Sequence, residues 1–148
     1  MKKGILLIVT VLTVGMTGLM ANGREGINEK ALSSFQKEFA NATNVKWQSG
    51  NAFLKVSFTF NDQVLTAFYN VEGERLAITR NIKSNELPMG LLEKLKESYS
   101  NCWITELFEF SGKEDAAYYV TMENADYKIT LKSLGMYDWV NFRKTEKK

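Results

Sequence analysis

Hydrophobic and polar residues alternate between two spacings along this chain. Within residues 29–39 apolar side chains recur every three or four positions, at Leu32, Phe35 and Phe39. This spacing places them on one face of a helix. Asn28 precedes the segment and can cap the helix, because its side-chain oxygen accepts hydrogen bonds from the first free amides.

After this helix the spacing falls to two, which predicts β-strands. The expected strands cover residues 44–48, 53–60, 64–71 and 75–82. Short turns such as Asn61-Asp62 and Glu72-Gly73 separate them. Strands joined by such short turns must pair as antiparallel neighbours.

The same order of elements then occurs again. Leu87-Pro88 suits the start of a second helix, because proline needs no helical hydrogen bond at the first position. Leu91, Leu95 and Tyr99 form its apolar stripe. Four more strands are expected at residues 103–110, 117–123, 127–132 and 136–143.

The chain therefore divides into two segments, residues 24–83 and 84–143, each with one helix and four strands. Phe35 and Phe39 align with Leu95 and Tyr99 when the segments are overlaid, and the inside–outside alternation of the strands is kept. The predicted fold class is α+β, a tandem repeat of one helix plus a four-stranded antiparallel sheet. The alternative, that any two such segments can be aligned, stays open.

One helix covers only one face of a sheet, so the other face should stay open to solvent or to a partner. Strand alternation assigns aromatic and basic side chains to that face, a mixture typical of protein-binding surfaces. The predicted partner-binding residues are Phe53, Lys55, Phe68, Arg75, Tyr119, Lys128, Lys132, Tyr137 and Trp139. The alternative is cross-strand aromatic pairing that only stabilises the sheet.

Residues 1–23 have the layout of a signal peptide. Lys2 and Lys3 precede an apolar run at residues 4–14, and small side chains at Ala21 and Gly23 fit a cut after Gly23. The alternative is a membrane anchor, but threonines and glycines make the run marginal for spanning. We therefore expect a periplasmic or secreted protein that is free of the membrane after cleavage.

Cleavage removes two of the 19 basic residues and leaves 17 basic and 17 acidic side chains. A chain with no net charge lacks the electrostatic footprint of a nucleic-acid-binding protein, so no nucleic-acid partner is predicted. The basic cluster at residues 144–148 is expected to form a frayed, solvated tail.

The sequence offers little catalytic chemistry. It has no histidine, the commonest general base and metal ligand, and Cys102 is its only cysteine, so no metal, cofactor or catalytic residue is predicted. Cys102 is expected to be a small buried apolar residue. Two carboxylates of an acidic group in the second segment could form a glycosidase pair, although solvated charges are the alternative. This group is Glu106, Glu109, Glu114, Asp115, Glu123 and Asp126.

Several short motifs resemble the PepSY-like proteins. Residues 39–47 (FANATNVKW) are similar to the opening motif of that family, in which a helix ending in an aromatic residue leads to an N-V-x-W strand. Residues 68–74 look like its third-strand hairpin, and Leu87-Pro88 with Leu91, Leu95 and Tyr99 resembles its second helix. Residues 118–121 resemble its next long strand. The resemblance covers most of residues 29–143.

This resemblance implies an exported protein of Gram-negative bacteria with the β-lactamase-inhibitor fold. In that fold two helix-plus-four-strand units form one continuous curved antiparallel sheet, with the helices packed on one face. In the inhibitor class the open sheet face grips a partner protein. The family pattern supplies no catalytic residue. This sequence departs from it at Ser100-Asn101-Cys102, where a proline often precedes the strand, which puts that turn in question.

The sequence thus predicts a non-catalytic exported binding module, an inhibitor-like protein that grips another exported protein or a peptide with its open sheet face. Two alternatives stay open. One is a structural envelope protein that self-associates through its aromatic face. The other is a carboxylate-based hydrolase.

Overall fold

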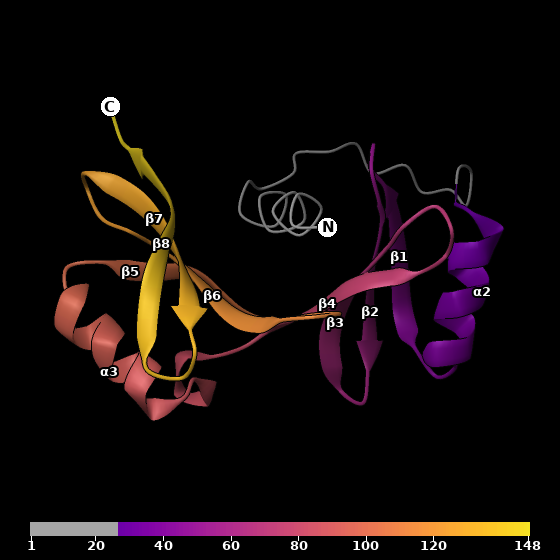
Figure 1. The fold of residues 1–148 in the computed structure, drawn as a ribbon, viewed down its shortest axis with the longest axis horizontal. Coiled ribbons are helices and arrows are strands. Elements are labelled where there is room, and N and C mark those ends of the chain that lie inside the picture. The colour runs from indigo at the N-terminus through magenta and orange to yellow at the C-terminus, as the bar shows by residue number, and fades with distance from the viewer. Residues whose placement is uncertain (1–26) are drawn as a thin grey trace. The chain divides into compact units, whose positions relative to one another are not determined.

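The computed structural model describes residues 27–148, so the predicted signal peptide lies outside the described residues. This part of the chain forms helices α2 (Glu29–Glu38) and α3 (Met89–Ser98), a short 3-10 helix η1 (Ser84–Glu86) and eight strands (Figure 1). The strands are β1 (Thr43–Ser49), β2 (Leu54–Phe60), β3 (Gln63–Tyr69), β4 (Arg75–Asn81), β5 (Trp103–Gly112), β6 (Ala116–Glu123), β7 (Tyr127–Leu134) and β8 (Asp138–Glu146). Every predicted helix and strand forms. Neither α2 nor α3 has the length and hydropathy needed to cross a membrane.

The strands are hydrogen-bonded in sequence order from β1 to β8, so each strand pairs with its neighbour in the chain. The pairing is antiparallel, as the short turns predicted. Leu54 stands opposite Tyr69 across β2 and β3, and Tyr119 stands opposite Lys132 across β6 and β7. The predicted α+β class with an antiparallel sheet is confirmed, whereas its origin in a duplicated segment stays a prediction.

The chain divides into two compact units, which we describe separately. Unit 1 extends to Arg80 and includes Ser111–Glu114. Unit 2 comprises Asn81–Phe110 and Asp115–Lys148. Unit 1 contains α2 and unit 2 contains α3.

The core of unit 1 lies between α2 and strands β2 and β3. Asn28 caps the helix as predicted, since its side-chain oxygen accepts a hydrogen bond from the Lys30 amide at 2.7 Å. Phe35 and Phe39 then point into the core, where the Phe35 ring meets Phe58 edge-on with centroids 4.9 Å apart. The buried core residues are Ala31, Phe35, Phe39, Leu54, Val56, Phe58, Ala67 and Tyr69.

The core of unit 2 has the same plan. Leu91 and Leu95 are the buried residues of α3, which begins after Pro88 as predicted. The buried cluster on the helix side is Ile82, Leu87, Leu95, Leu107, Val120, Met122, Ile129 and Leu131. Cys102 is only half-buried, and its sulfur lies 3.5 Å from the Tyr127 hydroxyl.

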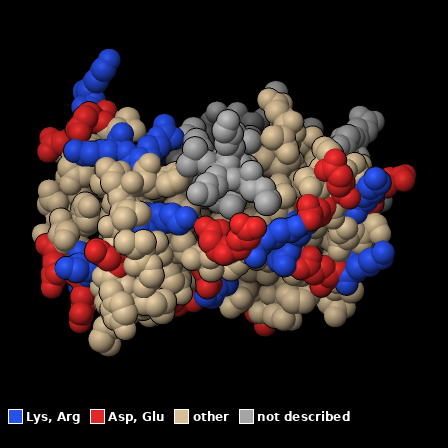
Figure 2. Space-filling view, in the orientation of Figure 1, with Lys and Arg blue, Asp and Glu red and all other residues tan. Residues whose placement is uncertain are grey.

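The C-terminal residues are not a frayed tail. Strand β8 continues to Glu146, and the Lys147 amide donates to the Asp126 carbonyl at 2.7 Å. The Lys147 ammonium lies 3.3 Å from the Glu123 carboxylate, which fixes its side chain as well. The predicted loose basic tail at 144–148 is therefore wrong for residues up to Lys147. Acidic and basic side chains are interspersed over the visible surface of each unit (Figure 2).

Candidate partner-binding surface

In unit 1 the sheet face opposite α2 carries the first three predicted residues. Lys55 stands opposite Phe68 across β2 and β3, and Phe53, just before β2, meets Phe68 edge-on with centroids 5.6 Å apart. Beside this pair the hydroxyls of Ser57 and Thr66 lie 3.2 Å apart. Aromatic, lysine and hydroxyl side chains thus share this face, as strand alternation predicted.

Unit 2 repeats this arrangement. Tyr119 stands opposite Lys132, whose ammonium lies 5.8 Å from the centre of the Tyr119 ring and 3.2 Å from an Asp115 oxygen. The hydroxyls of Thr121 and Thr130 lie 3.0 Å apart in the next cross-strand pair. The equivalent positions of the two units therefore hold an aromatic–lysine pair and a hydroxyl pair.

The three rings at these positions do not meet solvent, and the prediction that they would is wrong. Phe53, Phe68 and Tyr119 are 7%, 0% and 1% exposed. Around Tyr119, Phe108 stacks on the ring at 5.3 Å and Phe142 meets it edge-on at 5.5 Å. These contacts match the alternative of aromatic pairing that stabilises the sheet.

Arg75 lies on the helix side of the sheet, not on the predicted face. Its guanidinium lies 3.0 Å from Glu38 of α2. The register shifts between Phe68 and Tyr69, so that Arg75 stands opposite Tyr69, which belongs to the helix-side core. A bulge of this kind inserts one residue, here Leu76, and reverses the side that alternation assigns.

Trp139 also lies on the helix side. It stands opposite Ser133, packs against the unit 2 core and donates its indole N–H to the Leu91 carbonyl at 2.9 Å. Phe142, predicted to face the core, instead contacts Tyr119 on the opposite face. Both sides of β8 carry large apolar side chains, and the structure packs the Trp139 indole, not Phe142, against the helix-side core.

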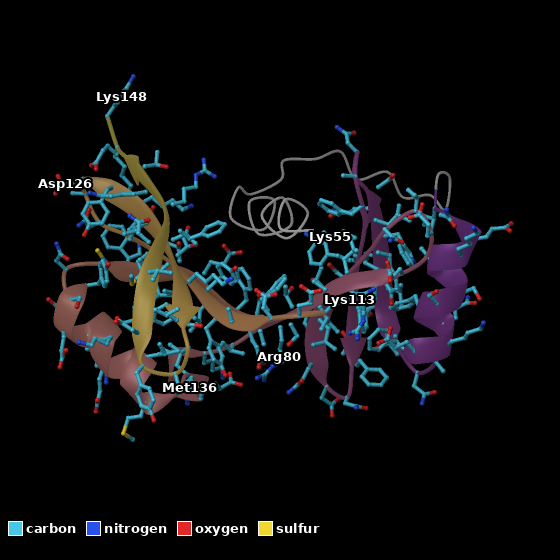
Figure 3. All side chains as sticks on the ribbon, viewed as in Figure 1. Lys55, Arg80, Lys113, Asp126, Met136 and Lys148 are labelled. Atoms are coloured by element: carbon cyan, nitrogen blue, oxygen red, sulfur yellow. The ribbon has the colours of Figure 1, made fainter. Side chains whose placement is uncertain are left out.

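Tyr137 lies in the turn between β7 and β8, against the start of α3. A β-carbon built on Gly90 would lie 2.6 Å from a ring carbon of Tyr137 and 3.1 Å from the Met136 carbonyl, so the turn packs closely on the helix. The apolar side chains of this region are nevertheless exposed: Met89 by 75%, Leu134 by 63%, Met136 by 52% and Tyr137 by 76%. We call these four residues the hairpin patch (Figure 3 labels Met136 at the turn).

Of the four hairpin-patch residues, sequence reasoning selected only Tyr137. Met136 falls within the strand expected at residues 136–143, and the sequence pattern predicts no role for Met89 or Leu134. The available signal was the concentration of large apolar side chains at a turn and a first helical turn, where polar residues are usual.

The resolved pKa shifts of the described residues have local causes, namely burial and hydrogen bonds to neighbouring side chains. Burial raises the pKa of the Tyr119 phenol, although the nearby Lys132 opposes the rise. A hydrogen bond from Lys147 lowers the pKa of Glu123, and one from Lys113 lowers that of Glu74. These shifts move the pKa values of the three groups away from neutrality.

The acidic group proposed for a hydrolase does not form a buried pair. Glu114 and Asp126 are exposed, and the other four carboxylates are half-buried. Asp115 is bound to Lys132 and Glu123 to Lys147. Across residues 27–148, no group of three or more histidine, cysteine or acidic side chains is arranged to hold a metal ion.

Comparison with known proteins shows what this arrangement resembles. No family model and no curated protein matches the sequence. A BLIP-like protein from Bacteroides fragilis matches in structure with a TM-score of 0.68 and 16% identity, over 80% of this chain and 85% of that chain. This chain has the same fold. The BLIP-like fold implied by the sequence resemblance is therefore confirmed, while membership of the PepSY-like family stays a prediction.

Two further Bacteroides structures share the BLIP-like fold. A DUF2874 family protein from Bacteroides uniformis matches with a TM-score of 0.72 and 11% identity, over 81% of this chain and 89% of that chain. A protein from Bacteroides eggerthii, named for a periplasmic location, matches with a TM-score of 0.72 and 12% identity, over 82% and 90%. At these identities the likeness extends to the fold.

Proposed function

We propose that this protein is an exported, non-catalytic binding module that grips a partner protein. The BLIP-like fold supports the proposal, since the inhibitor class that the sequence resembles uses this fold to hold another protein. The N-terminal signal-peptide layout and the periplasmic name of one structural neighbour support export.

The observation that carries this proposal is the exposure of the hairpin patch. Four large apolar side chains meet solvent in one region of unit 2. Large exposed apolar side chains that gather in one region cost solubility and usually mark an interaction site. Methionine and tyrosine are enriched at protein interfaces, where they supply adaptable and rigid contact area respectively. We therefore place the main contact with the partner here.

The predicted sheet face keeps a smaller part in the proposal. Its rings are buried, but Lys128 is exposed and Lys55 and Lys132 are half-buried. Charged side chains at the margin of an interface guide the encounter and set the orientation more than they add affinity. We propose that Lys128 and Lys132 of unit 2 act in this way, and that Phe53, Phe68 and Tyr119 stabilise the sheet.

Affinity capture tests the proposal. The mature exported protein is immobilised, incubated with an envelope extract of the source organism, and the retained proteins are identified by mass spectrometry. The test variant is Leu134→Gln with Met136→Gln, and the matched control is Val71→Gln, which changes an exposed apolar residue of unit 1. We expect one partner to be retained by the wild type and the control and lost from the test variant. Equal retention by all three would remove the hairpin patch from the proposal.

A further inference from the structure

One contact between a helix and a turn occurs in both units. In unit 1 the β3–β4 turn packs against the first turn of α2, where a β-carbon on Gly73 would lie 2.6 Å from the Lys30 carbonyl carbon. In unit 2 the β7–β8 turn packs against the first turn of α3, where a β-carbon on Gly90 would lie 2.6 Å from the Tyr137 ring. The glycine belongs to the turn in unit 1 and to the helix in unit 2. In each unit the missing β-carbon of the glycine lets the turn and the helix approach closely.

The surroundings of the two contacts differ in chemistry. Overlaying Gly73 on Gly135 places Glu72 at the position of Leu134 and Glu74 at the position of Met136. Overlaying the helices on Phe35 and Leu95 places Glu29 at the position of Met89. The three glutamates are exposed, and so are the three apolar residues that replace them.

This difference shows whether the helix–turn contact requires apolar residues around it. Unit 1 forms the helix–turn contact with glutamates around it, so the contact does not require apolar neighbours. The helix–turn contact of unit 2 therefore does not require the exposed apolar side chains around it. Exposing them to water is unfavourable. An occupant that covers them accounts for their presence.

The charges beside the hairpin patch indicate the occupant. Asp138 follows Tyr137 and Glu93 lies one helical turn after Met89, and both are exposed. Lys94 is the nearby cation on α3, and its ammonium lies 3.9 Å from Glu97, further along the helix. In a two-fold contact between copies, the patch would meet itself and bring the same carboxylates together. A partner with basic residues would instead pair with them.

We infer that the hairpin patch binds an apolar segment of the partner protein that is flanked by lysine or arginine residues. This inference rests on the proposed function and names the chemistry of its partner. The apolar side chains of the segment pack on Met89, Met136 and Tyr137. Its basic residues lie beside Asp138 and Glu93.

A pair of synthetic peptides tests this inference. One is a short amphipathic peptide of leucine and lysine, and the other has glutamate in place of each lysine. Each carries a fluorescent label, and binding to the purified exported protein is followed by anisotropy. We expect the lysine peptide to bind the wild type and the Val71→Gln control. The Leu134→Gln/Met136→Gln variant should lower its affinity about tenfold or more, and Asp138→Asn should lower it less.

Each other outcome overturns a distinct claim. Equal or tighter binding of the glutamate peptide would overturn the basic partner but keep the hairpin patch as a binding surface. Binding of the lysine peptide that ignores the Gln substitutions would overturn the patch as its site. No binding of either peptide would overturn the inference, while the capture experiment would still decide the proposed function. Loss of binding in the Val71→Gln control would show that the effect is not specific to unit 2.

Discussion

The indole Nε1–H of Trp139 donates to the main-chain oxygen of Leu91 across 2.9 Å, which ties strand β8 to the first turns of α3. The ring also packs against the core of unit 2. Trp139 is thus an anchor between two elements of the fold. Substituting it would test stability as much as binding.

The first prediction separates the two contributions of this anchor. Trp139→Phe keeps an aromatic ring but removes the donor, so we expect the free energy of unfolding to fall by about 1 kcal/mol. Trp139→Ala also removes the packing and should cost more, up to about 3 kcal/mol for this half-buried ring. Urea denaturation measures both. Tyr137→Ala is the control and should stay within about 0.5 kcal/mol of wild type, because its side chain is exposed. Equal losses at positions 137 and 139 would contradict the assignment.

The positions of the helices and strands were predictable because each element carries its own local signal. Leu54, Val56 and Phe58 alternate in the sequence and do face the helix-side core. Arg75 is an exception to strand alternation, because the one-residue bulge beside it cannot be recognised in the hydrophobic pattern. Trp139 is a second exception, because both sides of β8 carry apolar residues. Only packing against α3 decides which side faces the core.

The candidate site was less predictable than the fold, because exposure depends on residues distant in sequence. Tyr119 is buried by Phe108 and Phe142, which lie on different strands. The alternation of residues within β6 therefore cannot predict this burial. The hairpin patch exists because a turn packs on the start of α3, which brings Met89 close to residues more than 40 positions later. Sequence spacing alone does not reveal that approach.

The second prediction concerns two turn glycines with left-handed backbones. Gly73 has φ +82° and Gly135 has φ +65°, so alanine is strained at either position by about 1 kcal/mol. Only at Gly73 would the new methyl group also meet the Lys30 backbone, since nothing lies within 4 Å of a β-carbon at Gly135. Gly73→Ala should therefore lower the free energy of unfolding clearly more than Gly135→Ala. Thermal and urea unfolding of both variants measure the difference, and similar values would refute the close contact in unit 1.

The third prediction is a pH dependence of stability at the Glu123–Lys147 pair. The hydrogen bond from Lys147 holds the pKa of Glu123 below its usual value. A carboxylate with a lowered pKa in the folded state stabilises the fold above its unfolded pKa, about 4.3, and loses that contribution as the pH falls through the folded value. Lys147→Met should flatten the decrease in unfolding free energy at acid pH. Lys148→Met is the neighbouring control, and an identical pH profile for both variants would count against the pair.

The last prediction separates a binding module from a self-associating envelope protein. The chain expected after the predicted cleavage has 17 basic and 17 acidic side chains. It would carry no net charge to keep copies apart, a condition that favours association through an exposed apolar patch. The acidic residues Glu93 and Asp138 oppose this, because a two-fold contact would face them with their own copies. We therefore expect sedimentation equilibrium to give a monomer mass over a wide concentration range, at low and at high salt. A mass that rises with concentration in the wild type, and that Leu134→Gln/Met136→Gln returns to the monomer, would establish self-association through the hairpin patch instead.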